Sequence, residues 1–440
     1  MTKKTKNPAG LKRFFLKLSV VKNGLLVDGI VFLFLTGLNL VYLVPFVKKI
    51  DGVNDFSAPV IPGLARLLEL IFGLDSPRAI VISLIFFLCL SSAFLYFFSM
   101  RLCQRRLSAF ASALIYSLPM EWMAKGRIKM AFLVGDGGHI ASLSLIPLVA
   151  IFLLVFLRRG RFKNLVFASV IMALVALISP FGLLAGMMVL VVVVFSELLQ
   201  GEGRLKSLRF IIFLIISAGL MAFWYNPGFF FLFIKASQGK AIIGTFWNLV
   251  PLSFVVLPVL GAFGFLLFEK KARLQPLFIA LGLVILFSLV NFADYVGRFF
   301  PGHPRRYIPE LGFSVALLSG IIMTIFSDYL RFKGKFYKVK LSPLGRSLAR
   351  KSFWISTLGL MGAVTIFSLR SLWQLPESQV LGVLSEGLAG QIWTIKDQTG
   401  PVLTMSGYFL TGMTISLMVF LWLKMKKTKK NLGNKSFQGL

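Results

Sequence analysis

Apolar runs of about 14–23 residues recur along the whole chain and restrict it to folds that a lipid bilayer can hold. About 20 apolar residues in a helix cross the hydrocarbon core, and a backbone in lipid must satisfy its own hydrogen bonds. We therefore predict an all-α polytopic membrane protein with about 12 (11–13) transmembrane helices. The predicted spans are residues 24–47, 79–100, 108–120, 140–157, 165–179, 181–199, 210–225, 249–268, 276–293, 311–330, 353–369 and 403–423.

Composition and charge exclude several classes of protein. Hydrophobic residues make up 57% of the chain and charged residues 15%, whereas soluble domains average about 45–50% and about 25%. An ordinary cytosolic enzyme, a disordered protein and a disulfide scaffold are therefore excluded. The net charge of +32 would suggest nucleic acid binding in a soluble protein. Here 34 of the 48 lysines and arginines fall in alternate inter-span segments, as in cytoplasmic loops, so we expect no nucleic acid partner.

The same charge bias orients the chain. It places both termini in the cytoplasm and predicts a multi-pass protein of the plasma (inner) membrane, in contact with membrane lipids. The chain divides into a basic amphipathic N-terminus (1–23), one multi-span domain (24–423) and a basic tail (424–440). We expect short interfacial helices in the outer loops and no large soluble domain. The outer loops are 48–78, 121–139, 226–248, 294–310 and 370–402.

Acidic residues direct attention to the outer face. Eleven of the 16 aspartates and glutamates fall in outer segments, and no predicted span carries a charge at its middle. Transporters that couple to ions usually keep ionisable groups near the midplane of the bilayer, so this pattern argues against such a pathway.

The first outer loop carries carboxylates just beyond the first span. Asp51 and Asp55 lie four residues apart, after Lys48 and Lys49. Either carboxylate suits a general base or a metal ligand. The alternative is a solvated loop in which Asp and Asn side chains form turns. Further along this loop, residues 62–72 have apolar residues at helical spacing, which predicts an interfacial helix lying along the membrane.

The second outer loop ends in Gly135-Asp136-Gly137-Gly138-His139, directly before a strong span. Asp136 and His139 lie three residues apart at a helix start, so both can point to one side. An Asp oxygen with a His nitrogen suits Mn²⁺ or Zn²⁺, and the amides of a helix start favour a phosphate. The alternative is that Asp136 caps the helix while the glycines make the turn.

A later outer loop, residues 294–310, holds Arg305, Arg306 and Tyr307 among prolines. Arginine forks onto phosphate oxygens, so this group suits a phosphate or diphosphate. The alternative is anchoring at the membrane interface, where Tyr and Arg are common.

The arrangement of these features resembles the GT-C superfamily of integral membrane glycosyltransferases. A long first outer loop with acids is followed by Asp and His ahead of the span that begins at 140–148 (IASLSLIPL). A basic turn at 158–161 then leads to a short span that ends in Ile178-Ser179-Pro180. The 6-pyruvoyl-tetrahydropterin synthase-related membrane proteins of bacteria are similar in layout.

The resemblance implies transfer of a sugar from a polyprenyl-phosphate-linked donor at the extracytoplasmic face of the cell envelope. The acceptor would be a glycan, a lipid or a protein. Asp51 or Asp55 would be the catalytic base or first metal ligand, and Asp136 and His139 would complete a site for Mn²⁺ or Mg²⁺. The lipid phosphate would be bound by Arg305, Arg306, Tyr307, Lys48 and Lys49.

Two other functions stay open from the sequence. One is a multi-span transporter or a lipid or polysaccharide flippase, since flippases can work with few midplane charges. The other is a non-catalytic membrane assembly protein. Indifference to substitution of every outer acid would favour the assembly protein.

Overall fold

The computed structural model describes residues 8–49, 58–118, 124–133, 135–236, 240, 274–292, 304–332, 396 and 398–437. These residues form helices and contain no strand, and several of the helices are long and apolar, so the protein is all-α and embedded in a membrane. Asp51 and Asp55 lie outside the described residues, as do the spans predicted at 249–268 and 353–369. The side chains of Lys48, Lys49 and Arg305 are likewise outside the described part.

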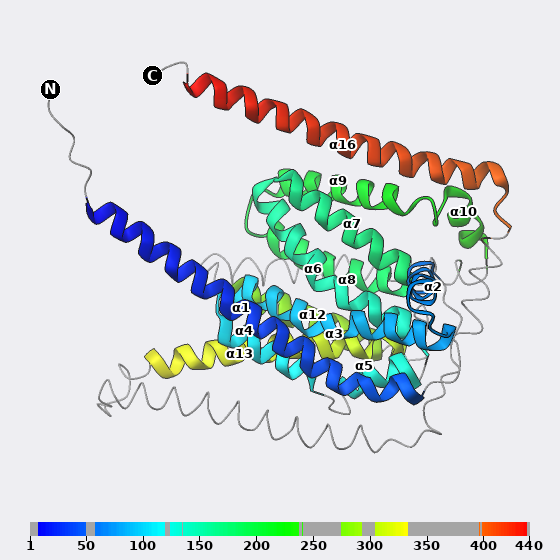
Figure 1. Cartoon of the computed structure of the whole chain (residues 1–440), viewed down its shortest axis with the longest axis horizontal. Helices are drawn as coiled ribbons and strands as arrows, with labels where there is room; N and C mark the ends of the chain where they lie inside the picture. Colours follow the sequence, from blue (N-terminus) through cyan, green and yellow to red (C-terminus); the bar gives the residue numbers. More distant parts are fainter. Residues whose placement is uncertain are drawn as a thin grey trace.

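Figure 1 shows the order of the helices along the chain. Their bounds are α1 (Pro8–Lys49), α2 (Val60–Phe72), α3 (Ser76–Cys103), α4 (Arg106–Ser117), α5 (Ala124–Ile128), η1 (Lys129–Leu133), α6 (Gly137–Arg159), α7 (Phe162–Ile178), α8 (Pro180–Leu198), α9 (Gly203–Met221), α10 (Pro227–Lys235), α12 (Gln275–Phe292), η3 (Pro304–Tyr307), α13 (Ile308–Phe332) and α16 (Pro401–Phe437).

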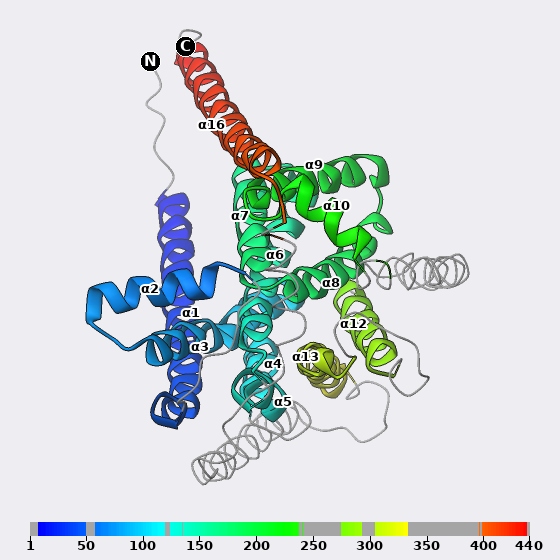
Figure 2. The ribbon, with the colours of Figure 1, turned by 90° about the vertical axis from the view of Figure 1, so that its right-hand side faces the viewer.

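Helix α6 is the centre of the bundle, where it packs against α3, α7 and α8 (Figure 2). Its apolar side chains are buried along most of its length, as expected for a helix without a polar face. Helices α1 and α16 lie at the periphery and expose many apolar side chains, which suits contact with lipid. Helix α1 begins and α16 ends on the same side of the molecule (Figure 1).

Six of the described helices are long and apolar enough to cross a membrane. They are Gly24–Val47, Ser76–Cys103, Gly137–Arg159, Pro180–Leu198, Ile308–Phe326 and Pro401–Met425, and each overlaps a predicted span. Helix α4 has 12 residues, or about 18 Å. It is too short to cross the about 30 Å hydrocarbon core alone, so the predicted span at 108–120 is not borne out as a full crossing. The total of about 12 spans remains a prediction.

Helix α2 confirms the helix predicted at 62–72. It ends at Gly73, whose φ of 65° is left-handed and suits glycine. The helix buries Ile61 and Ala65 and exposes Leu67, Leu70 and Phe72. It packs against α3 and α7, and its other side stays apolar and exposed, as in a helix that lies on a membrane surface.

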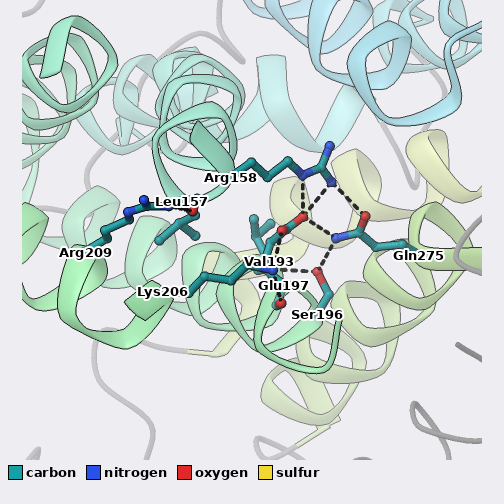
Figure 3. Close-up of polar contacts among 8 residues, drawn as sticks. All are labelled: Leu157, Arg158, Val193, Ser196, Glu197, Lys206, Arg209 and Gln275. Atoms are coloured by element: carbon teal, nitrogen blue, oxygen red, sulfur yellow. Dashed lines mark hydrogen bonds and ion pairs between the residues drawn. The ribbon is translucent and has the colours of Figure 1, made fainter. Parts of the chain in front are cut away.

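One end of the bundle is tied together by Glu197 (Figure 3). Its Oε1 accepts hydrogen bonds from Arg158 Nε (2.8 Å) and Gln275 Nε2 (2.6 Å). Lys206 Nζ donates to the Glu197 backbone oxygen (2.7 Å). These residues come from α6, α8, α9 and α12, so one fully buried carboxylate links four helices. The sequence pattern predicts all four residues at or near the cytoplasmic ends of spans, and their contacts place them together at one end of the bundle.

Helix α16 is held against α9 by close backbone contact. Thr411 Oγ1 donates to the Gly219 carbonyl oxygen (2.9 Å) and accepts from the Phe223 amide (2.9 Å). A Cβ added at Gly407 would overlap the Ala222 carbonyl oxygen, whereas a Cβ at Gly412 would meet nothing within 4 Å. Small residues commonly allow such close approach between helices in membranes.

We predict that Glu197→Gln destabilises the protein, because it leaves Arg158 and Lys206 without their shared negative charge. The expected loss is at the lower end of the about 3–5 kcal/mol typical of a broken buried pair, since Arg158 is partly exposed. Thermal unfolding of the purified protein in detergent measures it. Glu202→Gln, an exposed control, should change stability by less than about 0.5 kcal/mol, and equal effects of the two variants would contradict the tie.

We predict opposite effects of alanine at two glycines of α16. Gly412→Ala should stabilise the helix by up to about 1 kcal/mol, through helix propensity alone. Gly407→Ala carries the same propensity gain but must push α16 away from Ala222, so it should destabilise the contact. Hydrogen exchange at the Phe223 amide, which faces Thr411, should quicken only in Gly407→Ala. Unchanged exchange in that variant would count against the close contact.

Candidate functional site

The chain enters α6 through a sharp turn. Gly135 takes a φ of 79°, which glycine adopts without strain, so the predicted turn is confirmed. The Asp136 amide donates to the Met130 carbonyl oxygen (2.8 Å), across the π-helical turn η1. Asp136 directly precedes α6, but its carboxylate makes no capping hydrogen bond. The capping alternative is therefore wrong, and this carboxylate is available for another partner.

That partner is Arg306, from η3. Arg306 Nε lies 2.6 Å from Asp136 Oδ2, and the two side chains are only 12% and 11% exposed. The guanidinium carbon also lies 3.9 Å from the centre of the Phe181 ring, at the start of α8. A cation over an aromatic face contributes about 0.5–2 kcal/mol. An acid, a cation and an aromatic ring from three elements therefore meet at this end of the bundle.

A second pair lies one turn further into the helices. His139 Nε2 is 2.8 Å from Oε1 of Glu310, in the first turn of α13, and both side chains are 0% exposed. The His139 ring stands edge-on to Phe181 and Tyr307, with centroids 6.4 and 5.7 Å away. Within the described part of the chain, neither His139 nitrogen and neither Glu310 oxygen makes a hydrogen bond of normal geometry.

This pair is costly to bury. Removing a carboxylate from water costs several kcal/mol, which native proteins normally recover through hydrogen bonds to its oxygens. Glu197, at the other end of the bundle, recovers part of this cost through three hydrogen bonds to Oε1 and through Lys206 Nζ, 3.4 Å from Oε2, whereas among the described residues no such hydrogen bond reaches Glu310. Buried ionisable groups that stability alone does not explain concentrate at functional sites.

Tyr307 closes one side of the site. Burial raises the pKa of its hydroxyl above the usual range, so the group stays protonated at physiological pH. The Tyr307 carbonyl oxygen accepts from Asn291 Nδ2 (3.2 Å) in the last turn of α12. This contact fixes η3, and with it Arg306, against the end of α12.

The structure brings together four of the predicted site residues, namely Asp136, His139, Arg306 and Tyr307. Sequence reasoning did not assign Glu310 or Phe181 to the site. A signal for Glu310 was present, because it follows Tyr307 by three residues at the start of a span, and such a spacing shares one helical side. The signal for Phe181 was only its position after the Ser179-Pro180 break.

The described side chains offer only part of a ligand set for the predicted divalent cation. His139 and Glu310 supply one nitrogen and one carboxylate, which suits Mn²⁺ or Zn²⁺. Asp136, however, lies on Arg306, and in the described ranges no three His, Cys, Asp or Glu side chains are placed to share an ion. A metal ion on Asp136 and His139 therefore stays a prediction, and it would need a ligand from elsewhere in the chain.

Comparison with known proteins adds no assignment. A scan against protein-family models found no match, and a search of curated proteins found no significant match. The GT-C resemblance thus rests on the sequence features given above, and the function has to be inferred from the geometry of the site.

We predict that Glu310→Gln leaves the melting temperature of the purified protein unchanged or raises it. The substitution removes a buried carboxylate that makes no hydrogen bond of normal geometry with the described residues, and an amide can still face His139 across the 2.8 Å contact. Glu197→Gln is the matched comparison, since it changes an equally buried glutamate whose Oε1 accepts hydrogen bonds from Arg158 and Gln275. A loss for Glu310→Gln as large as that for Glu197→Gln would mean that the His139–Glu310 pair is structural.

Proposed function

We propose that the protein is a glycosyltransferase that moves a sugar from a polyprenyl-phosphate-linked donor to an acceptor at the end of the bundle that carries Asp136 and Arg306. The observation that carries the proposal is the buried His139–Glu310 pair beside the Asp136–Arg306 pair. Together they put proton-accepting groups and a cation within one turn of the starts of α6 and α13.

The position of the cluster supports chemistry at the membrane surface. His139 and Glu310 each lie in the first turn of their helix, so the cluster belongs to the ends of the spans rather than their middles. Arg158, near the other end of α6, is about 28 Å away along the helix axis. A polyprenyl phosphate keeps its headgroup at such an end and its chain in the lipid.

Arg306 is the proposed contact for the donor phosphate. Its Nε already lies 2.6 Å from one oxyanion, the Asp136 carboxylate, and a guanidinium can bind phosphate oxygens through two parallel N–H groups. A phosphate that takes the place of Asp136 would release that carboxylate beside the sugar. We assign Tyr307 to positioning rather than to phosphate contact, because it is fully buried against His139.

In the proposed reaction the acceptor hydroxyl oxygen forms a bond to the anomeric carbon while the bond from that carbon to the phosphate oxygen breaks. The hydroxyl proton passes to a carboxylate. The electron pair of the broken bond stays on the leaving polyprenyl phosphate, whose charge Arg306 stabilises. Asp136 and Glu310 are the described candidates for the proton acceptor, and Asp51 and Asp55 are those that the resemblance suggests.

Other proposed contacts come from the neighbouring loops. Arg305, Lys48 and Lys49 would add positive charge around the phosphate. A Mn²⁺ or Mg²⁺ ion on Asp136 and His139 would supply further charge for the leaving phosphate when bound.

A transporter or flippase is the second candidate, and one observation favours it. Arg127 is a fully buried cation among the helices, and charged groups inside a membrane bundle often mark a substrate path. Such a protein would release its lipid unchanged, whereas a transferase would return free polyprenyl phosphate.

We predict saturable binding of polyprenyl phosphate to the purified protein, measured by quenching of its tryptophan fluorescence or by native mass spectrometry. Arg306→Gln should raise the dissociation constant at least about tenfold, because a charge-assisted contact contributes about 1.5–3 kcal/mol to binding. Titration with and without Mn²⁺ or Mg²⁺ tests the metal site.

Arg66→Gln is the control, since Arg66 is an exposed arginine of α2 that pairs with Glu69. It should leave the dissociation constant unchanged. Absence of binding under every condition would reject the lipid-phosphate site, and an equal loss in both variants would show that the interaction is nonspecific attraction to charge.

A further inference from the structure

Arg127 is the largest fully buried side chain of the described part, with 1% of its surface exposed. It projects from α5 among α1, α3 and α4. Its Nη2 donates to Asn39 Oδ1 (2.8 Å), its Nη1 donates to Ser91 Oγ, and its guanidinium carbon lies 4.6 Å from the centre of the Tyr116 ring. All three partners are neutral.

The described residues place no carboxylate within 4 Å of Arg127, and its Nε has no hydrogen-bond partner there. Four other basic side chains at helix junctions differ. Arg106 lies on Asp28, Arg158 and Lys206 lie on Glu197, and Arg306 lies on Asp136.

A guanidinium stays protonated in proteins, so the cost of burying its charge is not relieved by loss of the proton. The neutral groups that surround Arg127 among the described residues recover only part of the cost of removing its charge from water. An anion that arrives with a ligand would recover that energy.

The neighbours of Arg127 define which anion fits. Asn39 Nδ2 donates to Ser92 Oγ (2.5 Å), so hydroxyl and amide groups surround the cation. The described neighbours add no second positive charge. One cation with neutral polar groups neutralises a monoanion, whereas a phosphate dianion would keep one charge unpaired. The flat fork of a guanidinium also matches the flat carboxylate group.

We propose that Arg127 anchors a binding site for a carboxylate-bearing ligand between α1, α3, α4 and α5. The site adjoins the start of α13, because a Cβ at Gly126 would lie 3.3 Å from Ile308 Cγ2 and Tyr116 packs on Phe313. The proposed ligand is held by Arg127 and not by the Asp136–Arg306 pair, and the proposal does not depend on the proposed sugar transfer.

The test is thermal unfolding of the full-length protein in detergent at constant ionic strength, with acetate, decanoate, inorganic phosphate or chloride added. Decanol controls for the alkyl chain of decanoate. Acetate should raise the melting temperature of the parent by about 2 °C or more at saturation, as a ligand that binds only the folded state does. A stronger response to decanoate than to acetate and decanol would identify a membrane-borne carboxylate. Equal responses to decanoate and acetate would identify a water-soluble one.

Arg127→Gln should abolish the acetate response and, without added anion, melt no lower than the parent, because it removes an uncompensated charge. Arg127→Lys keeps the charge without the fork, so it should fold and bind acetate about tenfold more weakly. Arg209→Gln, at the other end of the bundle, should respond as the parent does.

Three results would overturn the proposal. The first is a parent that responds to acetate no more than to chloride. The second is an acetate response that survives in Arg127→Gln. If the glutamine variant does not fold, the corresponding result is an acetate response in Arg127→Lys as strong as that of the parent. The third is a stronger response to phosphate than to acetate, which would reassign the ligand to another class.

Discussion

A charge among the helices of this protein has to find its partner inside the bundle, because neither lipid nor packed apolar side chains can solvate it. Glu197 meets this requirement by gathering nitrogen donors from three other helices. Asp28 does the same with Arg106 (2.6 Å) and the Tyr96 hydroxyl (2.7 Å). These pairings join segments that are far apart in the sequence, and they define one polar end of the bundle.

The opposite end follows the rule less completely. Asp136 and Arg306 are paired, but His139 and Glu310 are buried together without other hydrogen bonds from the described residues, which also place no counter-charge on Arg127. Such groups lower stability unless a substrate or ligand completes them. The difference between the two ends is therefore the physical basis for assigning structure to one and function to the other.

The periodicity of apolar residues predicted the helices better than it predicted the candidate functional site. The helix at 62–72 and the break before Pro180 were both predicted, because apolar spacing and proline act locally. The short α4 was read as a span, because an apolar run reports burial and not how far the helix extends. From the sequence, Asp136 was equally suited to a helix cap, a metal site or a phosphate site, since all three need an acid or open amides at a helix start. Only the structure removed the capping alternative, because its carboxylate makes no capping hydrogen bond and lies against Arg306.

The sequence by itself determined that the chain is helical and embedded in a membrane, and that Asp136, His139, Arg306 and Tyr307 lie near span ends. Hydropathy and charge are sufficient for these conclusions because bilayer thickness and backbone hydrogen bonding leave few alternatives. Only the tertiary structure decided that Glu310 faces His139 and that Phe181 lies under Arg306. Those pairings depend on which helices pack side by side, and the spacing of residues along one helix carries no information about its neighbours.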